Sequence, residues 1–407
     1  MTPAAIITVI SAYFAVILFI SWFTGRKSDN AGFFSGNRKQ SWYVVAIAMI
    51  GSAMSGVTFV SVPGMVATSG FGYMQMALGF IAGQIVIAFV LIPLFYRMNL
   101  VSIYGYLENR FGLSSYRTGA WFFFISKMLG ASVRLYLVCI ALQMMVFGPL
   151  GLPFLVNVAV TVLILIAYTF RGGVKAVIWI DFLKTFCMIV SIALCTIFIS
   201  KSLGFTFGSM CEAVAGSDMS RIFYFDDPDH PQYFFKQFFG GMFTLIAMTG
   251  LDQDMMQRSL TCKNFRDSQK NIITSALLQT VVIFLFLTLG VLLYFFAGAN
   301  GIDATGDTLF PAVATSGLLP AVVGIVFVVG LVSCSYAAGG SALTALTTSF
   351  TVDILGTAGK SEKEVKSMRE KVHIGMAVCM GLTIAVFNFI NNTSAIDAVY
   401  KLASYTY

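Results

Sequence analysis

Residues 49–58 read Met-Ile-Gly-Ser-Ala-Met-Ser-Gly-Val-Thr (MIGSAMSGVT), a run of small and hydroxylated residues inside the apolar stretch 42–69. An apolar stretch of this length spans a bilayer, since about 20 apolar residues cross the hydrocarbon core. Unwound backbone at membrane depth is tolerated only where it lines a cavity or is buried in protein. The run therefore predicts a broken membrane helix, and close helix packing through small residues is the alternative.

A second interruption follows five spans later. The stretch 234–250 contains Gly240-Gly241 and Thr244, and then Thr249-Gly250. Two interruptions five spans apart occupy corresponding places in two five-helix halves of opposite orientation. This pattern is typical of an inverted-repeat transporter that binds its solute at the two breaks.

The composition places the whole chain in a membrane. Of its 407 residues 58% are hydrophobic and 11% are charged, and the mean hydropathy is +0.85. Soluble domains have about a quarter of their residues charged, so a soluble, disordered or disulfide-rich protein is excluded. The seven cysteines are odd in number and sit mostly in apolar runs, where they act as small core residues.

We expect an all-α polytopic membrane protein, because no stretch shows the alternation of a β-barrel. Residues 1–407 form a single transmembrane transporter domain in this prediction. The predicted spans are 4–23, 42–69, 72–98, 119–147, 151–170, 177–204, 234–250, 271–298, 319–353 and 373–391, with 395–407 beginning another.

The distribution of Lys and Arg predicts the orientation. Most Lys and Arg residues fall in alternate loops, and the loops on the other side of the membrane hold only Lys201, Arg221 and Lys236. Because basic loops stay in the cytoplasm, the N-terminus is expected outside and the protein in the inner (plasma) membrane. The net charge of +7 is explained in this way, and we expect no nucleic-acid partner. The alternate loops carry Arg26, Lys27, Arg38, Lys39, Arg97, Arg110, Arg117, Arg171, Lys175, Arg258, Lys263, Arg266, Lys270, Lys360, Lys363, Lys366, Arg369 and Lys371.

Polar residues inside the spans are candidate functional residues. Asp181 lies near the cytoplasmic start of the sixth span, where it faces a partner or a cation, or else lies at the membrane surface. Arg134 lies inside the fourth span, about two turns past Lys127, and either faces a cavity or reaches the interface. The ninth span has Ser and Thr at helical spacing, which suit hydrogen bonds between helices and equally a monovalent cation.

Two outside loops have recognisable features. The loop 205–233 contains the cluster Asp226-Asp227-Pro228-Asp229-His230, for which a solvated loop is favoured over a metal site because ligand spacing is missing. Residues 302–316 suggest a short interfacial helix. No enzyme motif is present: we find no HExxH, no GxSxG with partners and no P-loop, so coupling must come from an ion gradient or a partner subunit.

Several ordered motifs resemble those of the sodium/solute symporter family. Their positions run from about residue 30 to the end of the chain. The resemblance implies a LeuT-like core of two inverted five-helix repeats (42–204 and 234–407), preceded by one extra helix (4–23). The motifs are Phe33-Phe34-Ser35-Gly36-Asn37-Arg38, Tyr104-Gly105-Tyr106-Leu107-Glu108-Asn109-Arg110-Phe111-Gly112, the stretch from Tyr168 to Asp181, Asp252-Gln253 with Gln257-Arg258 in the loop after the second broken helix, and Thr351-Val352-Asp353.

The resemblance implies a main sodium site between the first break and the ninth span. Carbonyls at Gly51 and Met54 match the family's ligands, and the register places a third carbonyl at Cys334. The two hydroxyl positions fall on Ala337 and Ala338, which departs from the family. A second sodium site of some members has a hydroxyl pair at positions 340 and 341, of which Gly340 lacks the hydroxyl and Ser341 retains it, and its acidic member matches Asp181. The two lost hydroxyls weaken the main sodium site unless water or Asp181 substitutes for them.

The resemblance also implies substrate positions, at the breaks and on neighbouring helices. Arg134 is close to the substrate arginine of sialic-acid transporters, and residues 54–58 resemble the monocarboxylate and anion branch. Both favour an anionic solute. The substrate positions are Thr58, Arg134, Met248, Thr249, Gln253 and Gln279.

The predicted function is cation-coupled, sodium-driven symport of a small polar or anionic organic solute by alternating access. The partners are the solute and the lipid bilayer, and the sequence does not indicate an oligomeric state. A solute sensor that moves little is the alternative, which the two alanines favour; an intramembrane enzyme lacks catalytic residues. The chain ends within the expected last core helix, so we expect that helix to be incomplete and the sequence to be truncated.

Overall fold

A computed structural model describes residues 3–26 and 29–390 of the chain. Within them, seven helices are long and apolar enough to cross a membrane, or nine if each of two bent helix pairs is one span. The shorter apolar helix α10 (Phe154–Thr169) accounts for the remaining predicted stretch. The all-α, multi-span fold is as expected from the sequence, and the predicted segment 395–407 lies outside the described residues.

The spanning helices follow the order of the predicted stretches. Several are longer than the apolar runs, because their polar ends continue beyond the hydrocarbon core. The bounds are α1 (Pro3–Gly25), α3 (Trp42–Ala53) with α4 (Gly56–Gly64), α6 (Tyr73–Val86) with η2 (Ile87–Leu91) and α7 (Ile92–Arg97), α9 (Leu113–Leu142) with η3 (Gln143–Phe147), α10, α11 (Gly173–Ser202), α13 (Phe234–Leu245) with η5 (Ile246–Gly250) and α14 (Gln253–Ser259), α15 (Phe265–Asn300), α17 (Ala321–Ser349) with η7 (Phe350–Ile354), and α18 (Glu362–Ile390).

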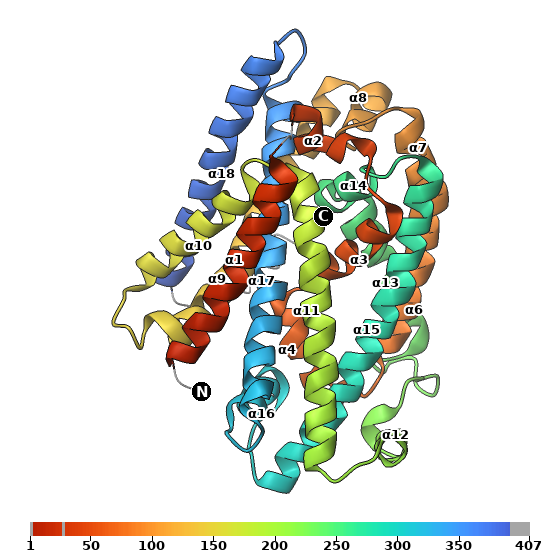
Figure 1. The fold of residues 1–407 in the computed structure, drawn as a ribbon. Helices are drawn as coiled ribbons and strands as arrows, with labels where there is room; N and C mark the ends of the chain where they lie inside the picture. Colours follow the sequence, from red (N-terminus) through yellow and green to blue (C-terminus); the bar gives the residue numbers. More distant parts are fainter. Residues whose placement is uncertain (1–2, 27–28, 391–407) are drawn as a thin grey trace.

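Short helices lie at the two ends of the bundle. In Figure 1, α12 and α16 lie at the end where the chain begins, while α2 and α8 lie at the opposite end. The helix predicted within 302–316 is confirmed as α16, whereas α12 was not expected. The bounds are α2 (Asn30–Ser35), η1 (Gly36–Arg38), α5 (Val66–Ser69), α8 (Gly105–Phe111), α12 (Phe207–Ala215), η4 (Asp218–Ser220), η6 (Gly306–Thr308) and α16 (Leu309–Thr315).

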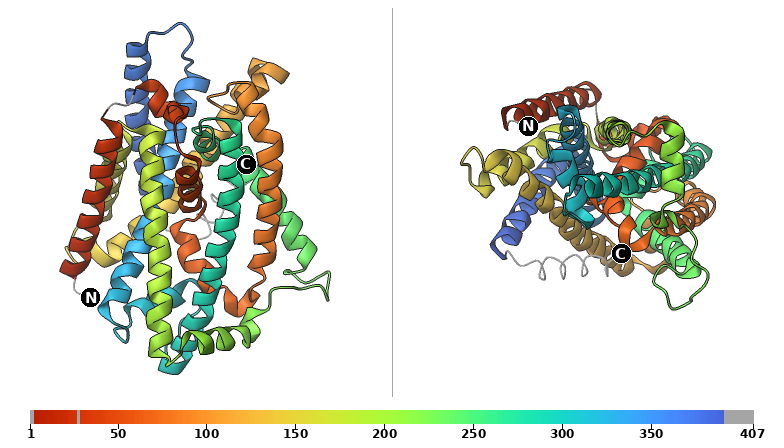
Figure 2. Two further views of the ribbon diagram at one scale, coloured as in Figure 1. Left: turned by 45° about the vertical axis from the view of Figure 1, so that its right-hand side comes forward. Right: turned by 90° about the horizontal axis from the view of Figure 1, so that it is seen from below.

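Helix α17 lies inside the bundle, and α1 lies at its edge (Figures 1 and 2). Helix α11 packs on α3, α15 and α17, and α1 contacts α10, α11 and α17. Outward-facing side chains of the spans are large and apolar, including Phe23, Leu163, Phe186 and Leu382. Such an apolar exterior is compatible with lipid and not with water.

The first predicted break is confirmed. Helices α3 and α4 are bent by 68°, and Met54 between them has extended backbone. Ser55 caps α4: its hydroxyl accepts from the Thr58 amide at 3.4 Å, and the Ser55 amide donates back to the Thr58 hydroxyl at 3.4 Å. This reciprocal cap satisfies backbone groups that the interruption frees.

The second predicted break is confirmed at its Thr249-Gly250 part and not at its earlier part. Helix α13 continues through η5 to Gly250, and α14 follows at an angle of 74°. Gly240, Gly241 and Thr244 lie inside the regular part of α13, so the prediction that they interrupt it is wrong. At Gly241 a Cβ would lie 2.5 Å from the carbonyl oxygen of Met76, so this glycine allows α13 to pack on α6.

The residues expected in the loop after the second broken helix form its second half, α14. Asp252 caps α14 by accepting from the Met255 amide at 3.1 Å, and Gln257 and Arg258 lie within that helix. Arg258 is 1% exposed, so counting it among the basic loop residues was also wrong.

Candidate cation and substrate site

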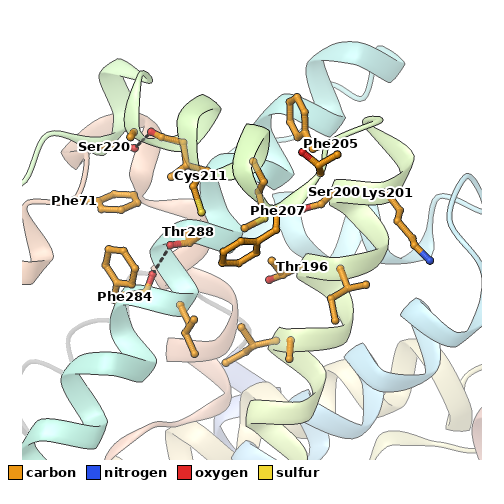
Figure 3. Close-up of a pocket in the computed structure, with 18 of the residues that line it drawn as sticks. Phe71, Thr196, Ser200, Lys201, Phe205, Phe207, Cys211, Ser220, Phe284 and Thr288 are labelled. Atoms are coloured by element: carbon orange, nitrogen blue, oxygen red, sulfur yellow. Dashed lines mark hydrogen bonds between the residues drawn. The ribbon is translucent and has the colours of Figure 1, made fainter.

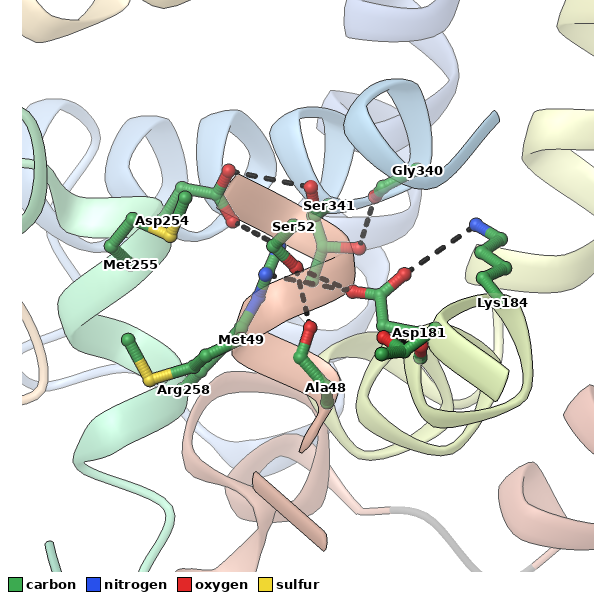
Figure 4. Close-up of polar contacts among 12 residues, drawn as sticks. Ala48, Met49, Ser52, Asp181, Lys184, Asp254, Met255, Arg258, Gly340 and Ser341 are labelled. Carbon is green, nitrogen blue, oxygen red and sulfur yellow. Dashed lines mark hydrogen bonds and ion pairs between the residues drawn. The ribbon is translucent and has the colours of Figure 1, made fainter. Parts of the chain in front are cut away.

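Six buried charged side chains form a cluster between the two broken helices and their neighbours. The Lys127 ammonium lies 3.0 Å from Asp252 and 2.9 Å from Asp254. The Arg258 guanidinium lies 2.8 Å from Asp254 and 3.5 Å from Asp181. The Lys184 ammonium lies 3.5 Å from Asp181. We call these six residues the charge cluster; Figure 4 shows the part around Asp181 and Asp254.

The charge cluster is formally neutral, with three cations and three carboxylates. Its members come from α9, α11, α14 and the residue that caps α14. Burying an unpaired charge costs several kcal/mol, so charges persist in a helix bundle when each has partners of opposite sign. The cluster therefore ties the second half of the second broken helix to α9 and α11.

Asp181 is fully buried, so the alternative of a membrane-surface aspartate is wrong. Besides the two cations, its carboxylate accepts a hydrogen bond of 3.0 Å from the Ser52 hydroxyl. Ser52 lies in the last turn of α3, directly before the first break. Asp181 thus links the sixth span to the end of the first broken helix.

The last turn of α3 supplies the carbonyls predicted to bind sodium. The final carbonyls of a helix have no intrahelical partner, and Gly51 is among them. The amide four residues on, that of Ser55, donates to Thr58 instead. Gly51 also has a packing role, since a Cβ there would lie 2.4 Å from the Thr185 hydroxyl oxygen of α11. Met54 has extended backbone at the break, and its side chain is buried.

Helix α17 carries the other predicted cation ligands, Cys334, Ala337, Ala338 and Ser341. Cys334 is buried. The Ser341 hydroxyl donates to Asp254 at 3.3 Å, which joins α17 to the charge cluster. Ala337 and Ala338 offer no hydroxyl oxygen to the main sodium site that the resemblance implies.

Position 340 has its space filled by another side chain. A Cβ on Gly340 would lie 1.9 Å from the Tyr168 hydroxyl oxygen. That hydroxyl donates to the Tyr336 carbonyl at 2.8 Å. Tyr168 of α10 therefore closes the surface of α17 where the resemblance implied a hydroxyl.

The predicted substrate residues Thr58, Arg134, Met248, Thr249 and Gln279 lie on four parts of the bundle, of which α4, α9 and α15 are brought together by α4. Thr58, Arg134 and Gln279 are half-buried on α4, α9 and α15, and α4 packs against both α9 and α15. On η5, Met248 is exposed and Thr249 is buried. Thr58 lies in the first turn of α4, where the backbone amides point toward the break.

Gln253 binds the backbone of segment 99–104, at the end of the bundle that contains α2 and α8. Its side chain is fully buried; it accepts from the Ile103 amide at 2.9 Å and donates to the Val101 carbonyl at 3.0 Å. Nearby, Asp353 accepts from Ser102 at 2.7 Å and from Tyr116 at 2.9 Å. These bonds fasten segment 99–104 to α14 and η7.

A cavity of about 810 Å³ lies elsewhere, at the other end of the bundle. Figure 3 shows Thr196 and Lys201 of α11, Cys211 of α12 and Thr288 of α15 around it. Its lining is mainly apolar and includes none of the residues predicted to bind a cation or a solute. We therefore place the candidate site at the breaks and not in this cavity.

The acidic loop 205–233 is solvated. Asp226 is exposed and pairs with Arg221, and His230 stacks on Tyr224. Among the described residues there is no group of three His, Cys, Asp or Glu able to hold a metal ion. The exposure of residues 226–230 is what the favoured interpretation, a solvated loop, predicts.

Sequence reasoning missed Lys184 and Asp254. Lys184 lies inside an apolar span three residues after Asp181, a spacing that places both side chains on one helix face. Asp254 and Arg258 have the helical spacing of four. Both spacings can be read from the sequence, the second of them once residues 253–259 are recognised as a helix.

Comparisons with known proteins agree with this geometry. The sequence profile of the Sodium:solute symporter family matches residues 33–406. The sodium/sialic acid symporter NanT of Aliivibrio fischeri is 25% identical, over 96% of this chain and 78% of its own. The human sodium/iodide cotransporter is 26% identical and human sodium-coupled monocarboxylate transporter 2 is 25% identical. The alignments cover 67% and 73% of this chain, but 43% and 50% of those proteins.

A solved structure has the same fold. It is the substrate-bound outward-open state of a Na⁺-coupled sialic acid symporter, with a TM-score of 0.84 and 19% identity. The match covers 98% of this chain and 85% of the other. The predictions of a LeuT-like fold and of a transporter, not an enzyme, are confirmed. The profile match over nearly the whole chain, on a fold with two broken helices, establishes that this multi-pass membrane protein belongs to the sodium:solute symporter family.

Proposed function

We propose that this protein is a sodium-coupled symporter that carries a small anionic organic solute by alternating access. The observation that supports this most is the pair of broken helices, α3–α4 and α13–α14, in corresponding spans of the bundle. Broken helices expose backbone groups in the middle of the membrane, and transporters of this kind bind solute and coupling ion there. Family membership supports the same function.

The anionic solute follows from the groups around the first break. Helix α4 begins at Gly56, so its free amides and the positive end of its dipole face the break. Arg134 lies on α9, which packs on α4. The relatives named above carry sialic acid, iodide or monocarboxylates, which are anions at neutral pH. Thr58, Met248, Thr249 and Gln279 would complete the solute site.

Sodium would bind between the end of α3 and α17. Carbonyls of Gly51, Met54 and Cys334 are hard oxygen ligands suited to a small cation, and Ala337 and Ala338 leave two ligand positions to water. A site with fewer protein ligands binds sodium more weakly, so we expect a higher half-saturating sodium concentration than in a relative with both hydroxyls.

The end with α2 and α8 would face the cytoplasm, with the N-terminus outside and the protein in the inner membrane. This orientation follows from the basic loops. The charge cluster, Gln253 and Asp353 then close the cytoplasmic side, which corresponds to an outward-facing conformation. The halves 42–204 and 234–407 would rock against each other, and sodium needs only to bind one conformation better to shift the population.

Uptake into proteoliposomes tests the proposal. With an inward sodium gradient, we expect uptake of sialic acid or a monocarboxylate, and little uptake when choline replaces sodium. Arg134→Gln should raise the solute KM, while the matched change Lys201→Gln, in the apolar cavity, should not. Solute binding without uptake in any gradient would support the sensor alternative, which the missing hydroxyls of α17 favour.

A further inference from the structure

Asp181 is the carboxylate closest to the first break in the bonding network, since it accepts from Ser52 one residue after Gly51. A transported cation at the end of α3 would be expected to use it, because a carboxylate is the strongest ligand for a hard cation. In the structure, however, the negative charge of Asp181 faces the ammonium of Lys184 at 3.5 Å and the guanidinium of Arg258 at 3.5 Å.

The two cations differ in their other ion-pair partners. Arg258 makes its short contact, 2.8 Å, with Asp254. Lys184 has Asp181 as its ion-pair partner and lies on the same helix, one turn away. Lys127 belongs to Asp252 and Asp254 on the other side of the cluster. Lys184 is therefore the main counter-ion of Asp181.

The surroundings hold Lys184 in this place. The side chain is 1% exposed, and its ammonium lies 5.3 Å from the centre of the Tyr168 ring, a distance that allows a cation–π contact. Tyr168 is itself fixed by its hydrogen bond to the Tyr336 carbonyl and by its fit against Gly340. The lysine head thus occupies a defined position among α10, α11 and α14.

We propose that Lys184 is a built-in cation that takes the place of a transported ion at Asp181. The charge cluster is already neutral, so a sodium ion at Asp181 would add an uncompensated buried charge, which is strongly unfavourable. The ammonium supplies the same charge without leaving the protein. Lys184 therefore determines ion specificity: it limits coupling to the carbonyl site between α3 and α17. The consequence for transport, that coupling is limited to the carbonyl site, rests on the proposed sodium coupling. The role of Lys184 at Asp181 does not.

The test measures sodium-induced thermal stabilisation of the purified full-length protein, with choline at equal ionic strength as the reference. A ligand that binds the folded state raises its unfolding temperature. In wild type and in Asp181→Asn we expect the same sodium-dependent shift, because the carboxylate does not bind the ion. In Lys184→Met, which keeps the shape and removes the charge, we expect an additional sodium-dependent rise.

The controls separate this gain from general effects. The double variant Asp181→Asn/Lys184→Met removes the pair as a neutral unit and should lose the additional rise. Lys201→Met removes a lysine outside the charge cluster, at the cavity at the other end of the bundle, and it should show no additional rise. If Lys184→Met does not fold, the comparison of wild type with Asp181→Asn still tests whether the carboxylate binds the ion, and a lost shift still overturns the proposal.

Two results would overturn the proposal. One is a wild-type sodium shift that disappears in Asp181→Asn, which would show that the carboxylate binds the ion despite Lys184. The other is a folded Lys184→Met without any additional sodium effect. Failure of the proposed function looks different: wild type then shows no sodium shift and no uptake, whereas the gain in Lys184→Met is still expected.

Discussion

The ammonium of Lys127 on α9 lies 2.9 Å from a carboxylate oxygen of Asp254 on α14, and both side chains are buried. The pair joins the second half of a broken helix to a helix of the other repeat. Because α14 also contacts α3 and α17, opening this end of the bundle, which is the cytoplasmic end in the proposed orientation, has to separate these groups. The pair is therefore part of the closure that defines this conformation.

Removing this lysine should open the cytoplasmic side. Lys127→Met leaves Asp252 without its ion-pair partner and Asp254 with Arg258 alone. Breaking a buried pair by removing one partner costs about 3–5 kcal/mol, which we expect to destabilise the closed form. Burial raises the pKa of the Cys262 thiol to about 12, so Cys262 is unreactive while this end is closed.

Maleimide labelling of Cys262 checks this expectation. We expect labelling at least tenfold faster in Lys127→Met than in wild type, because an exposed thiol has a lower pKa and a larger thiolate fraction at the same pH. The surface variant Lys201→Met should label at the wild-type rate. Equal rates in all three proteins would show that the pair does not hold the closure.

The hydrogen bonds of Asp353 should contribute to the same closure. Asp353→Ala leaves the hydroxyls of Ser102, Ser349 and Tyr116 without their acceptor. Hydrogen bonds to a charged group contribute about 1.5–3 kcal/mol each, so the segment around residue 102 should loosen. Hydrogen exchange of the amides of residues 99–112 should speed up, with no change in α12 at the other end. Unchanged exchange would contradict the assigned role.

A glycine pair on α15 tests how tightly the first broken helix is packed. At Gly290 a Cβ would lie 2.4 Å from the carbonyl oxygen of Pro63, at the outer end of α4, whereas at Gly298 it would meet nothing within 4 Å. Gly290→Ala should lower stability by about 1–3 kcal/mol and reduce uptake. Gly298→Ala should be neutral or stabilise by up to about 1 kcal/mol. Thermal unfolding of both variants measures the difference, and equal unfolding temperatures would contradict close packing of α4.

Native cysteines report the orientation. Cys211 on α12 is exposed, and α12 lies at the end of the bundle where the chain begins. In intact cells a membrane-impermeant maleimide should label the wild type and not Cys211→Ser. Cys379 is exposed on α18, whose surface faces lipid, and should stay unlabelled. Labelling of Cys211 only after the cells are opened would place the N-terminus inside.

The fold could be predicted from the sequence because bilayer spans and loop charges are local signals. The first break could also be predicted. Gly and Ser gather there inside an apolar span, where helix-capping residues are needed only if the helix ends. The second break was predicted only in part: Thr249-Gly250 ends directly at it, whereas the equally small Gly241 serves packing against α6, and at Gly240 a Cβ would meet nothing within 4 Å. The true break is marked by Asp252, a helix-capping residue that the apolar pattern alone does not reveal.

The charge cluster could be predicted only in part. Asp181 was recognisable as an acid inside a span, but its partners come from α14, more than 70 residues away in sequence, and such pairings depend on tertiary packing. Lys184 was within reach, because its spacing from Asp181 is local. The roles of Gln253 and Arg134 in solute binding remain predictions.

The most direct test of this account is the number of sodium ions carried with each solute. In proteoliposomes at zero membrane potential, the solute gradient that stops net flux is measured against an imposed tenfold sodium gradient. One coupled sodium, as expected with Lys184 at Asp181, balances a solute gradient of about tenfold, since equal free energies correspond to equal ratios. A balance near a hundredfold would mean that a second sodium binds, and no balance at any ratio would mean that sodium is not coupled; either result would contradict the account.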